Sequence, residues 1–221
     1  MLTACWSVKG GSGTTVVAAA MALGLAGVGR PVVAADFAGD LPAVLGVADP
    51  AGPGLLDWLD AGAAVPSDGL ARIAHVADHG ITIIPKGEWA TRAGAGDVDA
   101  GERLAAALRA VRGGSPVVAD CGKVDNAAMR AFVDAADRSF LVLRPCYLAL
   151  RRAMHAPRPT AVVLINEPER ALGAGDVEDV LGVPVVASIN WEPAIARAVD
   201  SGLLNGRVPR RLANALRAVA A

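Results

Sequence analysis

The sequence predicts an α/β domain built on a single doubly wound, mostly parallel β-sheet with helices on both faces. Short apolar segments alternate with longer alanine- and leucine-rich segments along all 221 residues, which is the order of a parallel sheet with crossover helices. The short segments are continuously apolar, as strands buried on both faces are. A glycine-rich segment, 9–15, joins the first short segment to the first long one. No repeat or linker interrupts this order, so we predict one domain over residues 1–221.

Strands are expected where aliphatic and β-branched residues form short runs bounded by glycine, proline or polar residues. Seven segments meet this description, and each one precedes a longer helical segment. They are Leu2–Val8, Pro31–Ala35, Gly80–Ile84, Pro116–Ala119, Phe140–Leu143, Ala161–Ile165 and Pro184–Ser188.

Helices are expected over the longer segments, several of which carry start signals. Asp99 is suited to capping a helix, with Glu102 three residues further on, and Pro209 suits a first helical turn. The expected helices are Gly13–Gly27, Gly54–Ala61, Asp99–Val111, Asn126–Ala136, Leu148–Met154, Ala174–Leu181, Glu192–Ser201 and Pro209–Val219.

Composition limits the possible partners and the compartment. Hydrophobic residues make up 53% of the chain and aromatic residues 4%, so small aliphatic side chains must build the core. A net charge of -1 gives no general attraction to nucleic acid or acidic membranes, and such binding would need a local patch. The three cysteines lack metal-site spacing, and we expect no signal peptide and no transmembrane segment. These features predict a cytoplasmic protein.

The segment Lys9-Gly10-Gly11-Ser12-Gly13-Thr14-Thr15 has the composition and the context of a phosphate-binding loop. A predicted strand precedes it and a predicted helix follows it, so backbone N–H groups and the helix N-terminus would point at one anion. Gly10, Gly11, Ser12, Gly13, Thr14 and Thr15 are therefore candidate nucleotide-binding residues, and the Thr15 hydroxyl is a candidate Mg²⁺ ligand. The alternative is a tight turn that only starts a helix.

These residues resemble the ParA/MinD group of P-loop ATPases, whose deviant Walker A loop reads Lys-Gly-Gly-x-Gly-Lys-Thr/Ser. Lys9 matches the first lysine, which in that group reaches across a nucleotide-sandwich dimer to the partner's phosphates. The resemblance implies a P-loop NTPase-like fold, bound ATP or ADP with Mg²⁺, and a homodimer. It also implies a catalytic role in trans for Lys9, if the protein is active.

Two further strands resemble motifs of this group. Segment 32–37 is similar to the strand that ends in an Asp-x-Asp motif, and segment 116–122 is similar to the Walker B strand. The resemblance implies that Asp36 and Asp120 take part in holding Mg²⁺, and that Asp36 also serves catalysis. Carboxylate oxygens suit that ion. Each aspartate has an alternative interpretation as a strand-end residue that caps a turn.

The adenine side of the site is suggested by two late segments. Segment 163–166 resembles the strand whose asparagine reads the base, and segment 184–193 resembles the strand and proline that close the base pocket. The resemblance therefore implies nucleotide binding by Asn166 and Pro193. Asn166 stands before Glu167 and Pro168 and suits a turn equally well. Segments 54–59 and 80–85 are most similar to the CpaE/TadZ and MinD branches, which position pili, secretion machines or division sites.

Two departures from the group's pattern affect hydrolysis. Thr14 stands in place of the loop lysine, and Ala38 stands in place of the aspartate that positions water; Asp40 lies out of register. Losing one preorganised donor typically costs about 2.7–4 kcal/mol, or roughly 10²–10³ in rate. A site of about −8 kcal/mol that lost about 3 would still bind at sub-millimolar concentration. We therefore expect impaired or absent hydrolysis and weakened binding of ATP or ADP with Mg²⁺.

The resulting expectation is a dimerising positioning or scaffold factor, a pseudo-ATPase that works with a protein partner in pilus, secretion or division-site assembly. One alternative is an active partitioning ATPase that uses Lys9 in trans. Another is a nucleotide-free protein-interaction module on the same fold.

The end of the chain is rich in arginine. Non-specific DNA binding would use these residues, although a solvated helix face explains them as well. They are Arg197, Arg207, Arg210, Arg211 and Arg217. The last helix suits packing on the sheet better than a membrane tail. Peripheral association with membrane or nucleoid stays open.

Overall fold

The computed structural model describes residues 1–66, 68–77, 80–87, 98–205 and 208–220. Among them, one sheet runs through the molecule in the strand order β3-β4-β2-β5-β1-β6-β7-β8. All neighbouring pairs are parallel except β3 with β4. The strands are β1 Leu2–Ser7, β2 Val32–Asp36, β3 His75–Val76, β4 Ile81–Ile84, β5 Val117–Lys123, β6 Arg138–Leu143, β7 Ala161–Asn166 and β8 Val185–Asn190.

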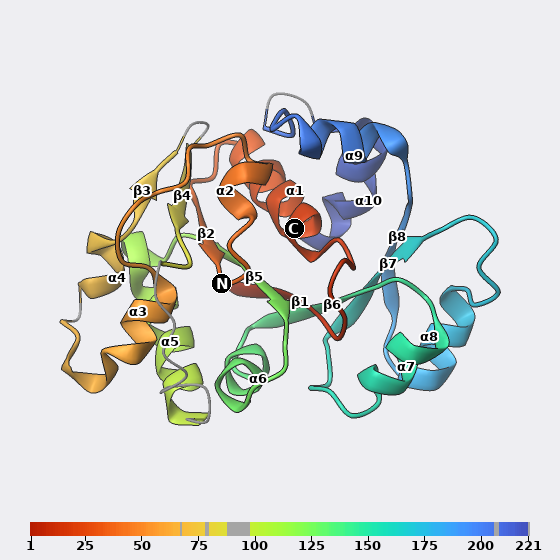
Figure 1. The fold of residues 1–221 in the computed structure, drawn as a ribbon, viewed down its shortest axis with the longest axis horizontal. Helices are drawn as coiled ribbons and strands as arrows, with labels where there is room; N and C mark the ends of the chain where they lie inside the picture. Colours follow the sequence, from red (N-terminus) through yellow and green to blue (C-terminus); the bar gives the residue numbers. More distant parts are fainter. Residues whose placement is uncertain (67, 78–79, 88–97, 206–207, 221) are drawn as a thin grey trace.

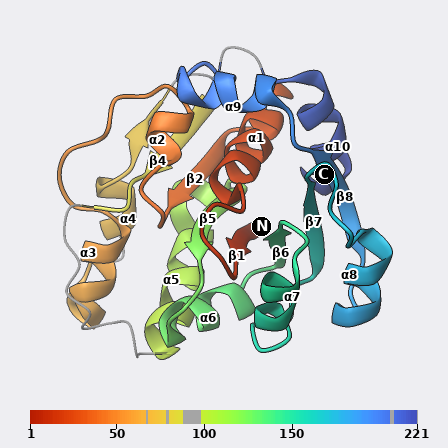
Figure 2. The ribbon, with the colours of Figure 1, turned by 45° about the vertical axis from the view of Figure 1, so that its right-hand side comes forward.

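Helices cover both faces of the sheet (Figure 1). The face with α1 and α10 includes the buried side chains Met21 and Leu216, and the face with α5 and α6 includes Leu104 and Phe132. Both layers are visible again in Figure 2. The helices are α1 Thr14–Gly27, α2 Leu41–Val44, α3 Leu55–Asp60, α4 Gly69–Arg72, α5 Val98–Ala110, α6 Ala127–Asp134, α7 Tyr147–Ala153, α8 Ala174–Leu181, α9 Pro193–Asp200 and α10 Arg210–Ala220.

The doubly wound, mostly parallel sheet predicted from the sequence is confirmed. Every predicted strand and helix has a counterpart within a few residues of its expected bounds, and α10 buries Leu212, Leu216 and Val219 as packing on the fold requires. The short elements α2, α4 and β3 were not predicted. They span two to four residues, and both residues of β3 are exposed, so none of them produces a hydrophobic pattern.

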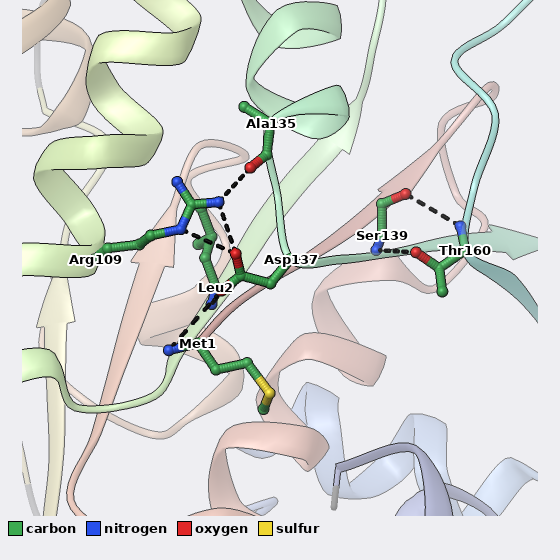
Figure 3. Close-up of polar contacts among 7 residues, drawn as sticks. All are labelled: Met1, Leu2, Arg109, Ala135, Asp137, Ser139 and Thr160. Atoms are coloured by element: carbon green, nitrogen blue, oxygen red, sulfur yellow. Dashed lines mark hydrogen bonds and ion pairs between the residues drawn. The ribbon is translucent and has the colours of Figure 1, made fainter.

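Polar side chains tie together the end of the sheet where β1 and β6 begin (Figure 3). The Asp137 carboxylate accepts hydrogen bonds from the Leu2 amide at 2.7 Å and from Arg109 Nε at 3.0 Å and Nη2 at 2.8 Å. Arg109 also donates to the carbonyl of Ala135. Between β6 and β7, the amide of Ser139 donates to the Thr160 hydroxyl at 3.0 Å. These contacts fix the amino ends of the strands, whereas the predicted site residues lie at the carboxyl ends.

None of the helices in the described part of the chain is long and apolar enough to cross a membrane.

Candidate phosphate-binding site

The glycine-rich loop connects β1 to α1 with an open backbone. Gly11 and Gly13 have φ angles of +73° and +88°, in the left-handed region that side chains disfavour. A Cβ atom at Gly10 or Gly11 would meet no heavy atom within 4 Å, so space lies above the loop. Gly13 occupies the N-cap of α1 and supplies no side-chain cap. The first N–H groups of this 14-residue helix are therefore available to an anion.

Serine hydroxyls hold the loop in this shape. Ser12 is buried and donates to the carbonyl of Lys9 at 2.7 Å. The Ser7 hydroxyl lies 3.0 Å from the same carbonyl and 3.1 Å from the carbonyl of Gly122, which joins the loop to the end of β5. Ser12, predicted to bind nucleotide, thus uses its hydroxyl within its own loop.

Lys9 lies on the outside of the loop. Lys9 is exposed. The pKa of Glu167 is lowered mainly by the hydrogen bond from Arg170, and the charge of Lys9 adds to this effect. Glu167 also forms an ion pair with Arg144 at 3.2 Å. This placement leaves the Lys9 ammonium accessible from solvent.

Two clefts meet over the loop. The first has a volume of about 770 Å³ and includes Thr14 and Thr15 of the loop, Ala38 after β2 and Lys86 after β4. The second, of about 480 Å³, passes between the loop and the ends of β7 and β8. Gly11 and Gly13 belong to both walls. Together the clefts give the loop one side suited to phosphates and another lined by larger apolar side chains.

Asp36 and Asp120 are brought together by the sheet. They are register partners, Asp36 at the carboxyl end of β2 and Asp120 within β5, and both are almost completely buried. Burial raises the pKa of both carboxyl groups, that of Asp120 to about 6, and each is raised further by a nearby negative charge. The Thr15 hydroxyl and the Gly122 amide oppose this shift at Asp120.

The two carboxylates have different partners. Asp36 Oδ1 accepts from the amide of Gly39 at 2.7 Å, and its Oδ2 accepts from the amide of Leu41 at 3.1 Å. Asp120 Oδ1 accepts from the amide of Gly122 at 3.1 Å. Asp120 Oδ2 is buried and has no hydrogen-bond partner among the described residues. One carboxylate thus organises a loop, whereas the other keeps a free oxygen.

The unpartnered Asp120 Oδ2 bears on whether Mg²⁺ fits this site. A hydroxyl from Thr15 beside an unpartnered carboxylate oxygen of Asp120 offers the hard oxygen ligands that Mg²⁺ prefers. Asp36, whose two oxygens are already bonded to backbone amides, suits contact through water better than direct ligation. Within the described ranges no three His, Cys, Asp or Glu side chains cluster as metal ligands. The residues fit an ion whose remaining ligands are phosphate oxygens and water.

On the adenine side, the structure places the predicted residues beside the second cleft rather than in its wall. Asn166 ends β7 and donates from Nδ2 to the Ser188 hydroxyl at 2.5 Å. Pro193 is exposed at the first turn of α9. The described wall instead includes Asn190 and Trp191, at the end of β8.

Sequence reasoning missed Asn190, Trp191, Arg144 and Lys86. All four stand at or just after the carboxyl ends of parallel strands, which is where ligands of open α/β sheets gather. That rule, applied to every predicted strand, would have found these residues.

No family model matches the sequence. Two curated relatives, both uncharacterized proteins of Mycobacterium tuberculosis strains, are 35% identical over 130 residues. The match covers 56% of this chain and 37% of each relative, so the chain spans little more than a third of their length.

Solved structures resemble the whole chain. The septum site-determining protein MinD of Pyrococcus horikoshii, complexed with Mg-ADP, has a TM-score of 0.76 at 22% identity, covering 99% of this chain and 93% of its own. A ParA family ATPase of Chlorobium tepidum scores 0.75 at 20% identity, covering 99% and 98%. Apo McdA of Cyanothece scores 0.78 at 14% identity, covering 100% and 99%. The chain therefore has the MinD/ParA-type P-loop fold.

Proposed function

We propose that this chain is a MinD/ParA-like nucleotide-binding protein with impaired or absent ATP hydrolysis. It acts through residues 1–221 as one domain, dimerises through its nucleotide face, and serves as a positioning or scaffold factor. The observation that carries the proposal is the first cleft, whose wall contains the open glycine loop together with Thr14 and Ala38.

Nucleotide binding is supported by what the loop retains. The left-handed glycines, the uncapped start of α1 and the pair Thr15–Asp120 supply anion and Mg²⁺ contacts that do not depend on a loop lysine. MinD of Pyrococcus horikoshii, which has the same fold, is complexed with Mg-ADP in its structure. We therefore propose ATP or ADP with Mg²⁺ as the ligand, held less tightly than by a loop with its lysine.

Impaired hydrolysis is supported by Thr14 and Ala38, which line the same cleft. Neither side chain carries a charge to a γ-phosphate, and Ala38 has no polar atom with which to orient a water molecule. Phosphoryl transfer depends almost entirely on positioning and charge stabilisation, so the two losses act on one reaction.

Dimerisation is supported by Lys9, which is exposed beside the loop rather than directed into a cleft of its own subunit. We propose that it contacts the nucleotide of a second copy.

A chain of the MinC:MinD complex of Aquifex aeolicus has the same fold, which supports a protein partner in a pilus, secretion or division machine of the cytoplasm.

DNA or membrane association would rest on the arginines near the end of the chain. Arg197, Arg210 and Arg211 are exposed, but Arg211 forms an ion pair with Glu192 at 3.1 Å. Arg207 lies outside the described residues, as does the side chain of Arg217.

The decisive experiment compares the wild type with Thr14→Lys, Ala38→Asp and the double variant. Calorimetry would measure the affinity for Mg-ADP and for a non-hydrolysable ATP analogue, and a phosphate-release assay would measure turnover. We expect wild-type binding at sub-millimolar concentration or tighter, and turnover at least about 10²-fold below that of the double variant.

Two results would overturn the proposal. Absence of binding at millimolar nucleotide would leave a nucleotide-free interaction module. Wild-type turnover equal to that of the double variant, abolished by Lys9→Ala, would show an active ATPase that uses Lys9 in trans. Sedimentation of the wild type and Lys9→Ala, with and without nucleotide, tests the dimer separately.

A further inference from the structure

Lys86 places a cation in the wall of the phosphate cleft. It follows β4, which pairs with β2 in the sheet. Its ammonium donates to the carbonyl of Ala38 at 3.1 Å, and the residue is half-buried in the cleft that also contains Gly13 and Thr14. Lys86 therefore lies next to the position where the catalytic aspartate is missing, in the cleft where the loop lysine is missing.

The backbone of Lys86 is held firmly. Its carbonyl accepts from the amide of Leu56 at 3.0 Å, and the carbonyl of Pro85 accepts from Leu55 at 2.9 Å, so the start of α3 anchors this turn. The side-chain stem passes over Gly39, where a Cβ atom would lie 3.2 Å from Lys86 Cδ. Gly39 has a φ of +99°, and glycine keeps this passage open.

Among the described residues, no carboxylate pairs with the charge of Lys86. The sequence contains three lysines: Lys9, Lys86 and Lys123. Lys123 forms an ion pair with Asp125 at 3.0 Å, and Lys9 lies outside the clefts near Glu167. No carboxylate of the described residues lies within 4.0 Å of the Lys86 ammonium, whose partner is a neutral carbonyl.

We infer that Lys86 is the cation that contacts the terminal phosphates of a bound nucleoside di- or triphosphate within its own subunit, in place of the absent loop lysine. The inference rests on the proposed nucleotide-binding function. The flexible four-carbon stem lets the ammonium leave the Ala38 carbonyl for a phosphate oxygen. The attraction between opposite charges strengthens a hydrogen bond from the ammonium to a phosphate oxygen, and the neutral Ala38 carbonyl lacks this attraction, which favours the exchange.

The test compares Lys86→Met, which keeps the apolar stem, with Lys86→Arg, which keeps the charge. Arg72→Met is the matched control, because it removes an exposed cation that pairs with Asp68 on α4, away from the clefts. Calorimetry in Mg²⁺ buffer would measure adenosine, ADP and a non-hydrolysable ATP analogue. We expect Lys86→Met to weaken the ATP analogue about 10- to 100-fold, with adenosine unchanged and Lys86→Arg within about fivefold of wild type.

The outcomes distinguish the role of Lys86 from the proposed function. Wild-type binding that Lys86→Met leaves intact would overturn the role of Lys86 and keep the proposed function. Equal losses for adenosine and the ATP analogue would show that Lys86 only tethers the Ala38 loop. No nucleotide binding by the wild type would overturn both proposals.

A second measurement needs no variant. Amine acylation of the wild-type protein, followed by peptide mass analysis, reports each of the three lysines separately. We expect Mg-ADP or tripolyphosphate to slow labelling of Lys86 several-fold more than that of Lys123. Equal labelling rates for Lys86 with and without saturating ligand would contradict the inference.

Discussion

Asp36 at the end of β2 and Asp120 within β5 are paired in register, yet only Asp120 keeps an unpartnered carboxylate oxygen. The difference arises from the path that the chain takes beyond each aspartate. After Asp36 the chain turns back into α2 and sends the amides of Gly39 and Leu41 to its carboxylate. After Asp120 the strand continues, and its carboxylate receives one amide, from Gly122. The pair therefore divides into a structural carboxylate and one available to a ligand.

The first prediction concerns Asp36. Asp36→Ala should lower the free energy of unfolding by about 2 kcal/mol, because the amides of Gly39 and Leu41 lose their acceptors in a buried place. Asp40→Ala is the matched control, since Asp40 is exposed and makes no side-chain cap to α2; it should change stability by less than about 0.5 kcal/mol. Urea unfolding of both variants checks this. An equal decrease in the free energy of unfolding for both variants would mean that the Asp36 hydrogen bonds do not stabilise the fold.

The second prediction concerns pH and Asp120. Its pKa in the folded protein is about 6, above an unfolded value of 3.8, because burial disfavours the charged form. The folded state then binds the proton more tightly, so the ionised carboxylate costs stability above about pH 6 and this cost disappears as pH falls toward 4. Without Mg²⁺, Asp120→Asn should be the more stable protein at pH 8, by up to about 2–3 kcal/mol.

The measurement for Asp120 is thermal or urea unfolding of both proteins from pH 4 to pH 8 in the presence of a chelator. The stability difference should shrink steadily as pH falls. A difference that stays constant across this range would show that the carboxylate does not titrate there. Mg-ADP should reverse the order of stability at pH 8, because the wild type alone retains the proposed ligand oxygen.

The third prediction concerns Asp137, whose pKa is lowered mainly by hydrogen bonds from Arg109 and from the Leu2 amide (Figure 3). A depressed pKa gives stability that is present above the unfolded value of 3.8 and is lost as pH falls through the folded value. The carboxylate is 40% exposed, so solvent screening limits the contribution to about 1 kcal/mol or less at pH 7. Asp137→Asn should be less stable than wild type by that amount at pH 7 and indistinguishable from it near pH 2, as measured by urea unfolding. A deficit that persists at pH 2 would point to lost packing rather than lost charge.

The sequence was sufficient for features that are local in the chain. The loop from Lys9 to Thr15 could be recognised because its glycines, its strand and its helix are contiguous, and buried parallel strands show as unbroken apolar runs. Asp36 and Asp120 were found because each directly follows such an apolar run.

Features that depend on strand order were not predictable in the same way. Lys86 reaches Ala38 only because β4 lies beside β2, and the Asn166 amide is engaged because β8 places Ser188 next to it. No local pattern specifies these neighbours. The second oxygen of Asp120 stays unpartnered where β5 continues beyond Asp120, whereas the predicted strand ended at Ala119.

The last prediction uses two helical glycines with opposite surroundings. A Cβ atom at Gly101 on α5 would lie 2.1 Å from the Ala128 carbonyl oxygen and 2.8 Å from the Phe132 amide nitrogen on α6. At Gly24 on α1 it would meet nothing within 4 Å.

Alanine in a helix interior is favoured over glycine by about 0.5–1 kcal/mol, so Gly24→Ala should raise the free energy of unfolding by that amount. Gly101→Ala should lower it by about 1–3 kcal/mol, because backbone rather than a flexible side chain blocks the new methyl group and α5 must move away from α6. Urea unfolding of the two variants beside the wild type checks both signs, and a stabilised Gly101→Ala would mean that α5 and α6 do not approach as closely as the structure places them.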